Sequence, residues 1–151
     1  MDCVIQYCST EADLVDDCVA AASASCDKVF LVVLTHFFTG EPDPEAWIKA
    51  RDLAHRFKNV TPVLVQWKHM PGAPPLFWHH EARLMGYSMG NNPWVLFLDA
   101  DEVIRDSNAF KAWWSNLSDS QNPTTAYKLA NYWYFLSKKR RAKTLEDSVV
   151  L

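Results

Sequence analysis

The stretch KVFLVVLTHF, from Lys28 to Phe37, decides the fold of this chain. The six residues from Val29 to Leu34 are all apolar, and half of them are β-branched valines. A strand with one solvated face alternates apolar and polar residues, whereas a strand without alternation is buried on both faces. Such strands belong to parallel sheets covered by helices. The stretch therefore predicts an α/β protein with a mostly parallel central sheet flanked by helices.

The segment before this strand predicts a first strand and a first helix. CVIQYC, from Cys3 to Cys8, is short and apolar. The following helix is expected to begin at Ser9 or Thr10 and to run to about Ala24, because Thr10 and Asp13 have the spacing of a capping box. Its small apolar residues would let it lie close to a sheet.

The segment after this strand continues the alternation of helices and strands. Asp43 as N-cap and Pro44 at the first helical position predict a second helix, whose apolar residues recur at helical spacing as far as Phe57. The elements expected next are strand 60–67, helix 76–90, strand 94–103, helix 107–117 and strand 125–135, and residues 144–151 begin a further element. This order predicts one parallel α/β domain over residues 1–151 with right-handed crossovers.

Composition excludes several classes of protein. The net charge of −3 argues against a nucleic-acid binder. No apolar run approaches 18 residues, so no membrane span is expected. The acidic start does not resemble a secretory signal, and the four cysteines lack metal-site spacing. We therefore expect reduced thiols and a cytoplasmic protein.

Two further patterns in the sequence narrow its function. Its four glycines form neither GxGxxG nor a Walker loop, so the usual dinucleotide and P-loop sites are not expected. Residues 138–143 are mostly basic. They are interpreted as a solvated turn or helix face, with contact to a phosphate or an anionic lipid, or a localisation signal, as the alternatives. A peripheral membrane contact is thus compatible with the cytoplasmic expectation.

The fourth expected strand ends in an unusual concentration of negative charge. In WVLFLDADEVIRD, from Trp94 to Asp106, an apolar run leads directly into Asp99, Asp101 and Glu102. Ligands of open parallel sheets bind at the carboxyl ends of strands. On a continuing strand, Asp99 and Asp101 would face the same side, and a divalent cation would relieve their repulsion. Mn²⁺ or Mg²⁺ bound in this way also takes substrate phosphates as ligands, so a phosphorylated substrate is expected.

Several segments, in order along nearly the whole chain, resemble the GT-A glycosyltransferases of the family 2 type. LFLDADEV (96–103) is similar to the family's DxD segment, and VIQYCSTEADLVDDCVAAA (4–22) is similar to its opening strand, loop and helix. Arg83 and Gly86 in EARLMG are similar to the family's R-N-x-G pattern. LEDSVVL (145–151) resembles the Glu-Asp pair that supplies a catalytic base. The resemblance implies a GT-A, Rossmann-like architecture.

The resemblance also implies a role for individual residues. Asp99 would contact the ribose or the metal, Asp101 would hold the metal, and Asp147 would be the base, with Glu146 in reserve. The positions expected to bind the nucleotide sugar are Gln6, Tyr7, Ser9, His36, Arg83, Asp99 and Ala100. Thr35 and His36 stand where the family usually has an Asp that reads uracil.

The activity implied by the resemblance is inverting transfer of a sugar from a UDP- or GDP-sugar to a hydroxyl of a glycan, lipid or protein. Residues 1–106 would form the donor-binding half, and residues 107–151 the start of the acceptor half. The family continues beyond the presumed base, whereas this sequence ends at Leu151. The apolar C-terminal edge would also allow a homodimer.

Three alternatives stay open from the residues alone. DADEV also matches the DxDx(T/V) pattern of haloacid-dehalogenase-like phosphatases, in which Asp99 would be the nucleophile. The chain would otherwise be a nucleotide-sugar-binding module without catalysis. Glu146 and Asp147 would in turn suit the first turn of a helix capped by Thr144.

Overall fold

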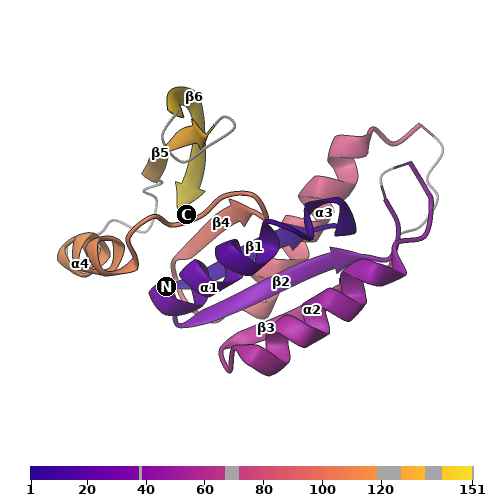
Figure 1. Ribbon diagram of the computed structural model, residues 1–151, viewed down its shortest axis with the longest axis horizontal. Helices are drawn as coiled ribbons and strands as arrows, with labels where there is room; N and C mark the ends of the chain where they lie inside the picture. The colour runs from indigo at the N-terminus through magenta and orange to yellow at the C-terminus, as the bar shows by residue number, and fades with distance from the viewer. Residues whose placement is uncertain (38, 67–71, 119–126, 135–140, 151) are drawn as a thin grey trace.

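The computed structural model describes residues 1–37, 39–66, 72–118, 127–134 and 141–150, with only the backbone described at 75, 76, 118, 128–134 and 141–150. Its sheet has the order β3-β2-β1-β4-β6-β5 (Figure 1). The first four strands in this order are mutually parallel. They are β1 (Asp2–Tyr7), β2 (Lys28–Leu34), β3 (Val60–Val65) and β4 (Val95–Asp99). The predicted α/β class with a mostly parallel sheet is confirmed.

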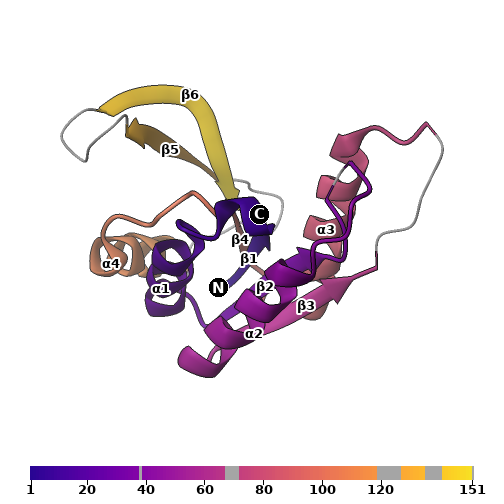
Figure 2. The same ribbon diagram turned by 45° about the vertical axis from the view of Figure 1, so that its right-hand side comes forward.

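Helices cover both faces of the parallel strands. They are α1 (Val15–Ser25), α2 (Pro44–Arg56), α3 (Pro75–Met89) and α4 (Ser107–Ser118). One core layer joins the sheet to α1, α2 and α4, and a second joins its opposite face to α3 (Figures 1 and 2). The residues from Val29 to Leu34 of β2 are all buried, as their lack of alternation predicted. The fold is thus a four-stranded, Rossmann-like parallel sheet flanked by four helices.

Helix α3 lies unusually close to the sheet. A Cβ atom placed on Gly86 would lie 2.5 Å from Cγ1 of Val4 and 2.8 Å from Cγ2 of Val32. Real Cβ atoms do not approach other heavy atoms this closely, so this contact with β1 and β2 requires glycine. On the same helix, Leu84, Met85, Tyr87 and Met89 are exposed.

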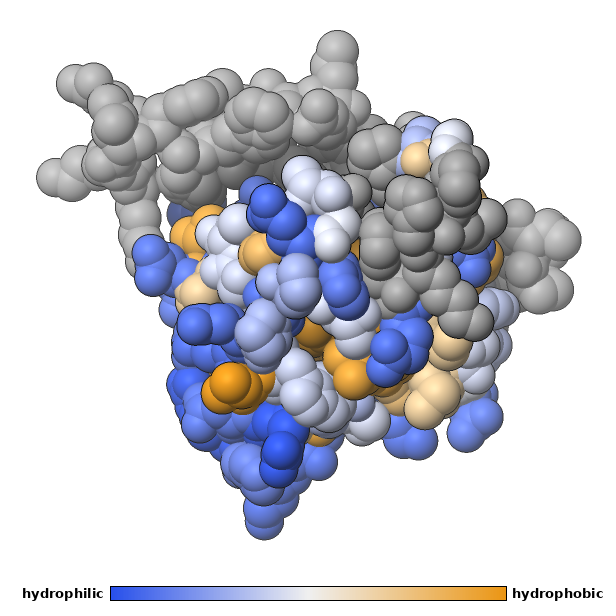
Figure 3. Space-filling view, turned by 90° about the vertical axis from the view of Figure 1, so that its right-hand side faces the viewer, coloured by the Kyte–Doolittle hydropathy of each residue, from blue (hydrophilic) through white to orange (hydrophobic). Residues whose placement is uncertain are grey.

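The face shown in Figure 3 is mainly hydrophilic, with apolar side chains in small areas between the polar ones.

The first helix begins later than predicted. Residues Ser9–Glu11 form a single 3-10 turn, η1, and α1 starts at Val15 with Leu14 as its N-cap. The expected capping box at Thr10 is therefore wrong. The backbone N–H of Ser9 donates instead to Asp43 Oδ2 at 2.9 Å, and the N–H of Cys8 donates to Glu11 Oε2 at 3.4 Å. These bonds hold the segment after β1 in a turn.

The fourth strand ends earlier than predicted, at Asp99 rather than Val103. The N–H of Glu102 donates to the carbonyl of Asp99, and the Asp99 N–H donates to Glu102 Oε2, both at 2.9 Å. Asp101 therefore lies in a turn, and the alternation of a continuing strand does not apply to the two aspartates.

The C-terminal part adds two strands to the sheet, β5 (Tyr127–Tyr134) and β6 (Arg141–Val150). β6 is antiparallel to both β4 and β5. The alternative interpretation of Glu146 and Asp147 as acids in the first turn of a helix is wrong, because both lie in β6. Residues 138–140 of the basic run lie outside the described residues, and residues 141–143 lie in β6 rather than in the expected turn or helix. Within the part of the chain that the structure describes, no helix has the length and apolarity needed to cross a bilayer.

Candidate functional site

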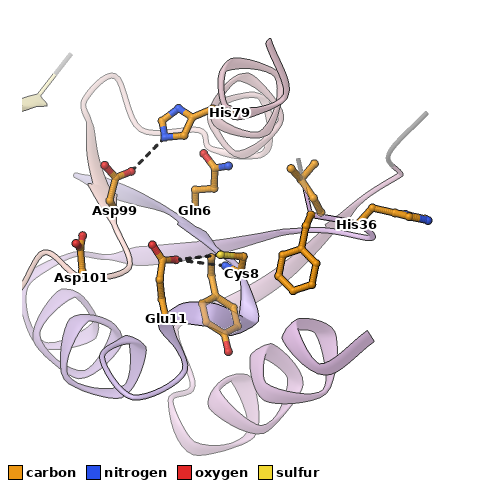
Figure 4. Close-up of a pocket in the computed structure, with 10 residues that line it drawn as sticks. Gln6, Cys8, Glu11, His36, His79, Asp99 and Asp101 are labelled. Carbon is orange, nitrogen blue, oxygen red and sulfur yellow. Dashed lines mark hydrogen bonds and ion pairs between the residues drawn. The ribbon is translucent and has the colours of Figure 1, made fainter. Parts of the chain in front are cut away.

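A pocket lies where the chain order of the parallel strands reverses. From β1 the sheet grows through β2 to β3 on one side, and β4 then joins β1 on the other side. This reversal leaves a crevice at the carboxyl ends of β1 and β4, which is where open α/β sheets bind ligands. The pocket there has a volume of about 230 Å³. Its lining residues are Gln6, Tyr7, Cys8, Glu11, Leu34, His36, Phe37, His79, Asp99 and Asp101 (Figure 4).

Asp99 is held by two basic side chains of α3. Arg83 Nη2 donates to Asp99 Oδ1 at 2.7 Å, and His79 Nε2 lies 3.4 Å from the same oxygen (Figure 4). His79 and Arg83 are four residues apart, so they project from one face of the helix. The hydrogen bond from His79 and the charge of Arg83 hold the pKa of Asp99 below its usual range, although partial burial opposes this shift. Asp99 is therefore ionised, and within the described residues its Oδ2 atom accepts no hydrogen bond.

A second group of carboxylates lies across the pocket from α3. Figure 4 shows Glu11 and Asp101 on the side opposite His79. Burial raises the pKa of Glu11, and the negative charges of Asp101 and Asp99 raise it further. The hydrogen bonds that Glu11 accepts from Cys8 act in the opposite direction. Because Glu11 resists ionisation beside these neighbours, this side of the pocket carries a negative potential that favours a cation.

Two polar groups in the pocket wall are buried without a hydrogen-bond partner. They are Gln6 Oε1 and the hydroxyl of Tyr7. Gln6 is 9% exposed and Tyr7 is 2% exposed. Burial, followed by the charge of Asp43, raises the pKa of Tyr7 to about 12, so this hydroxyl keeps its proton. A buried polar group without a partner is costly, and a bound ligand is one way to supply the missing bond.

The end of β2 contributes mainly apolar surface. Leu34 and Phe37 line the pocket there. His36 also belongs to the lining, but Figure 4 shows its ring directed away from the other labelled residues. Its Nδ1 atom lies 2.9 Å from the Thr35 hydroxyl. The pocket is therefore acidic at the β4 end and apolar at the β2 end.

The predicted site residues are only partly brought together. Gln6, Tyr7, His36, Asp99 and Asp101 line the pocket, and Arg83 reaches it through Asp99. Ser9 is outside the lining, where its N–H binds Asp43. The side chain of Ala100 is fully buried in the core. The predicted bases Glu146 and Asp147 lie in β6, where the structure describes the backbone alone.

Five pocket residues were not predicted from the sequence, the apolar Leu34 and Phe37 and the polar Cys8, Glu11 and His79. Cys8 and Glu11 directly follow β1, and residues after a parallel strand lie at its carboxyl edge, so their positions were a usable signal. His79 precedes Arg83 by one helical turn, which was a second signal. The adjacent His80 is exposed, whereas His79 is half-buried.

The donor set suits a divalent cation that shares its coordination with a ligand. Among the described residues, no three His, Cys, Asp or Glu side chains form a group that would hold a metal alone. Mg²⁺ and Mn²⁺ prefer oxygen ligands, and Mg²⁺ commonly takes only one or two carboxylates with water and phosphate. Asp101 is exposed, and its carboxylate forms no hydrogen bond with the part of the chain that the structure describes, which fits that arrangement. One carboxylate oxygen of Asp99, Oδ1, already accepts a hydrogen bond from Arg83 of α3.

No protein-family model and no curated protein sequence matches this chain.

Proposed function

We propose that this protein is a metal-dependent glycosyltransferase with a GT-A architecture, which transfers a sugar from a nucleoside-diphosphate sugar to a hydroxyl with inversion. The observation that carries the proposal is the pocket at the strand-order reversal, where Asp99 and Asp101 share the lining with Gln6, whose buried Oε1 has no hydrogen-bond partner. Its acidic end suits a cation with a diphosphate, and its apolar end suits a planar base. The volume accommodates only part of such a ligand, because small-molecule sites typically measure about 300–1,000 Å³.

The described residues divide into binding and orienting roles. Asp101 would hold Mn²⁺ or Mg²⁺, which when bound would stabilise the charge that grows on the diphosphate as the sugar leaves. Arg83 and His79 fix Asp99 through Oδ1, which leaves Oδ2 to accept a hydrogen bond from a ribose hydroxyl. The hydrogen bonds of Glu102 fix the turn that carries Asp101.

The strand register supports Asp147 as the base. Leu96 of β4 pairs with Val150 of β6 in antiparallel orientation. Three residues further along β4 is Asp99, and three residues back along β6 is Asp147, so both positions are displaced toward the same end of the sheet. The backbone N–H of Asp99 donates to Glu102 Oε2, so it does not form a hydrogen bond with the backbone of β6. A carboxylate near this edge would take the proton of the acceptor hydroxyl, an effect typically worth about 10²–10⁴-fold.

The phosphatase alternative has less support. Phosphatases of that type need a lysine beside the nucleophilic aspartate, and no lysine lines the pocket within the described part of the chain. A radiolabelled phosphate that became covalently bound to Asp99 would restore this alternative.

The proposal is tested by calorimetric titration of the protein with UDP and GDP, with and without Mn²⁺. We expect binding that needs the metal and that falls by at least about tenfold in Asp101→Asn, because charge-assisted contacts are worth more than about 1.4 kcal/mol. Asp17→Asn is the matched control, since Asp17 is an exposed carboxylate of α1 outside the pocket.

The outcomes separate the three functions. Metal-dependent binding together with release of nucleoside diphosphate from a nucleotide sugar, lost in Asp147→Asn, supports the transferase. Binding without any release under all acceptors tried indicates a binding module. Equal affinities of wild type and Asp101→Asn contradict the proposed cation site.

A further inference from the structure

Gln6 lines the pocket with a buried side-chain amide, which carries both a donor and an acceptor. It is 9% exposed, and its Oε1 has no hydrogen-bond partner. It pairs in register with Asp99 of β4 and with Val32 of β2. Val4, two residues earlier, contacts α3 at Gly86, so Gln6 projects from the same face of the sheet. Figure 4 shows its amide between Asp99 and His36.

The order of the strands places Gln6 on the nucleoside side of the proposed donor. Asp101 follows β4 and would lie at the diphosphate end of the donor. From β4, the sheet continues to β1 and then to β2. Neighbouring strands are about 4.8 Å apart, so β2 is roughly 10 Å from β4. A ribose beside Asp99 therefore directs the base toward Gln6 and the apolar residues Leu34 and Phe37. No carboxylate is among the described lining residues at this end.

We propose that the Gln6 side-chain amide reads the nucleobase, and that the pocket consequently accepts pyrimidine and purine nucleotides with similar affinity. This inference rests on the proposed function and adds the class of donor to it. A carboxylate is an acceptor only, whereas an amide has a donor and an acceptor that exchange places when the group rotates by 180°. Uracil and guanine offer a ring N–H beside a carbonyl, and cytosine and adenine offer a ring nitrogen acceptor beside an amino group. The amide matches all four edges.

The test compares UDP, CDP, GDP, ADP and inorganic diphosphate by calorimetry at saturating Mn²⁺. The proteins are wild type, Gln6→Glu, which is nearly isosteric, and Gln6→Met, which lacks both hydrogen-bonding atoms. Each nucleotide affinity is divided by that of inorganic diphosphate, which removes effects on the metal end of the pocket. Melting temperatures identify a variant that has not folded, and the wild-type comparison needs no variant.

For wild type, we expect the four normalised affinities to agree within about tenfold, the effect of one hydrogen bond. Gln6→Met should weaken all four by about tenfold or more. Gln6→Glu should weaken CDP and ADP by about tenfold relative to UDP and GDP, because a carboxylate cannot donate to their ring nitrogens.

Three results would overturn the inference while leaving the proposed function intact. One is a wild-type preference above about 100-fold for a single base, which is more than one hydrogen bond supplies. Another is an unchanged base profile in both folded variants. The third is a loss in Gln6→Met that affects nucleotide sugars but not free nucleotides, because Gln6 would then contact the sugar. If neither the nucleotides nor inorganic diphosphate bind wild type, the proposed function fails, and this inference fails with it.

Discussion

Asp99 and Glu11 line the same pocket, but their surroundings shift their pKa values in opposite directions. Asp99 has two basic neighbours on α3, whereas Glu11 is partly buried opposite other carboxylates. One acid is thus compensated within the protein and the other is not. The uncompensated charge is the part of the site that a bound cation would stabilise.

Glu11→Gln should make the ligand-free protein more stable at neutral pH. Glu11 has a usual pKa of 4.5 that folding raises. Below 4.5 the residue is protonated in both the folded and unfolded states and contributes nothing. As the pH rises through the higher folded pKa, the ionised side chain destabilises the fold, and this cost persists above it. We expect a rise in melting temperature of no more than about 3 °C, the effect of roughly 1 kcal/mol on a chain of this size.

The measurement is the melting temperature of both proteins between pH 4 and pH 8. The difference should be absent at the acidic end and should shrink at neutral pH when Mn²⁺ is added. A variant that is less stable at every pH would show that the hydrogen bonds to Cys8 matter more than the charge.

Among single residues, the sequence predicted those whose chemistry is independent of distant neighbours. Asp99 and Asp101 were recognisable because acids directly follow an apolar strand. The lack of a hydrogen-bond partner at Gln6 Oε1 was not, because it depends on which atoms of other elements surround the side chain. The outward direction of His36 likewise depends on its contact with Thr35 in a loop that bridges back to Pro42.

Helix α3 connects packing to the site. Its contact with β1 and β2 at Gly86 sets the height of Arg83 and His79 above Asp99. The sequence had indicated Gly86 only by family resemblance. The structure gives the physical reason, which is the lack of space for a Cβ atom.

Gly86→Ala should destabilise the fold by about 1–3 kcal/mol, the usual cost of overpacking a core. The sign is informative because Gly→Ala within an unstrained helix should stabilise it by up to about 1 kcal/mol. Nucleotide affinity should fall as well, because the helix that positions Asp99 is displaced. Urea unfolding and calorimetry measure the two effects.

Ser88→Ala on the exposed side of α3 is the control: it removes only a local hydrogen bond from the Ser88 hydroxyl to the Met85 carbonyl, so it should leave nucleotide affinity unchanged and alter stability by less than about 1 kcal/mol. Adding Val4→Ala to Gly86→Ala should restore part of the nucleotide affinity, since it removes the atom that the new methyl group approaches most closely. If Gly86→Ala stabilises the protein, the close approach of α3 is incorrect.

The types and order of the elements were predictable, but their ends were not. α1 and β4 differ from prediction for the same reason. Before α1, the side chain of Asp43 accepts a hydrogen bond from the backbone N–H of Ser9 and holds the segment in a turn. At the end of β4, the side chain of Glu102 accepts a hydrogen bond from the backbone N–H of Asp99. The local sequence pattern predicts the helix and the strand, but not which carboxylate will determine where the helix begins and the strand ends.

At the scale of the whole molecule, Asp16 links two helices of the same layer. It forms ion pairs from α1 with Lys49 and Arg56 of α2. The hydrogen bond from Lys49 is the largest cause that lowers the pKa of Asp16; burial opposes it, and the hydrogen bond from Arg56 lowers the pKa further. A lowered pKa in the folded state contributes stability above the usual value of 3.8, and this contribution is lost as the pH falls through the folded pKa.

Asp16→Asn should therefore lower the melting temperature by about 1–3 °C at pH 7, consistent with partly exposed ion pairs. The stabilities of the two proteins should begin to converge as the pH falls below 3.8 and should meet below the lowered folded pKa of Asp16. They should also converge at 1 M NaCl, where charges are screened within about 3 Å. Asp13→Asn is the control, because Asp13 is exposed and forms no ion pair among the described residues. A difference that persists at low pH would show a packing effect rather than an electrostatic one.

The order of the strands in the sheet was beyond prediction from the sequence. Apolar runs identify strands that are buried on both faces, but β1, β2 and β4 all have such a run, so the pattern does not tell which of them is central. The central place of β1 follows from its pairing with β2 and β4 at once. Register is a property of pairs, and a single sequence without relatives contains no information about which pairs form.

The pairing of Gln6 with Asp99 also has a consequence for biosynthesis. The two residues are partners in the sheet, yet 93 positions separate them in the chain (99 − 6). At about 5–20 residues per second, a ribosome needs roughly 5–20 s to make that interval. During this time the nascent β1 has β2 as a partner but an open edge on its other side. That edge would be a natural binding site for a chaperone until translation delivers β4.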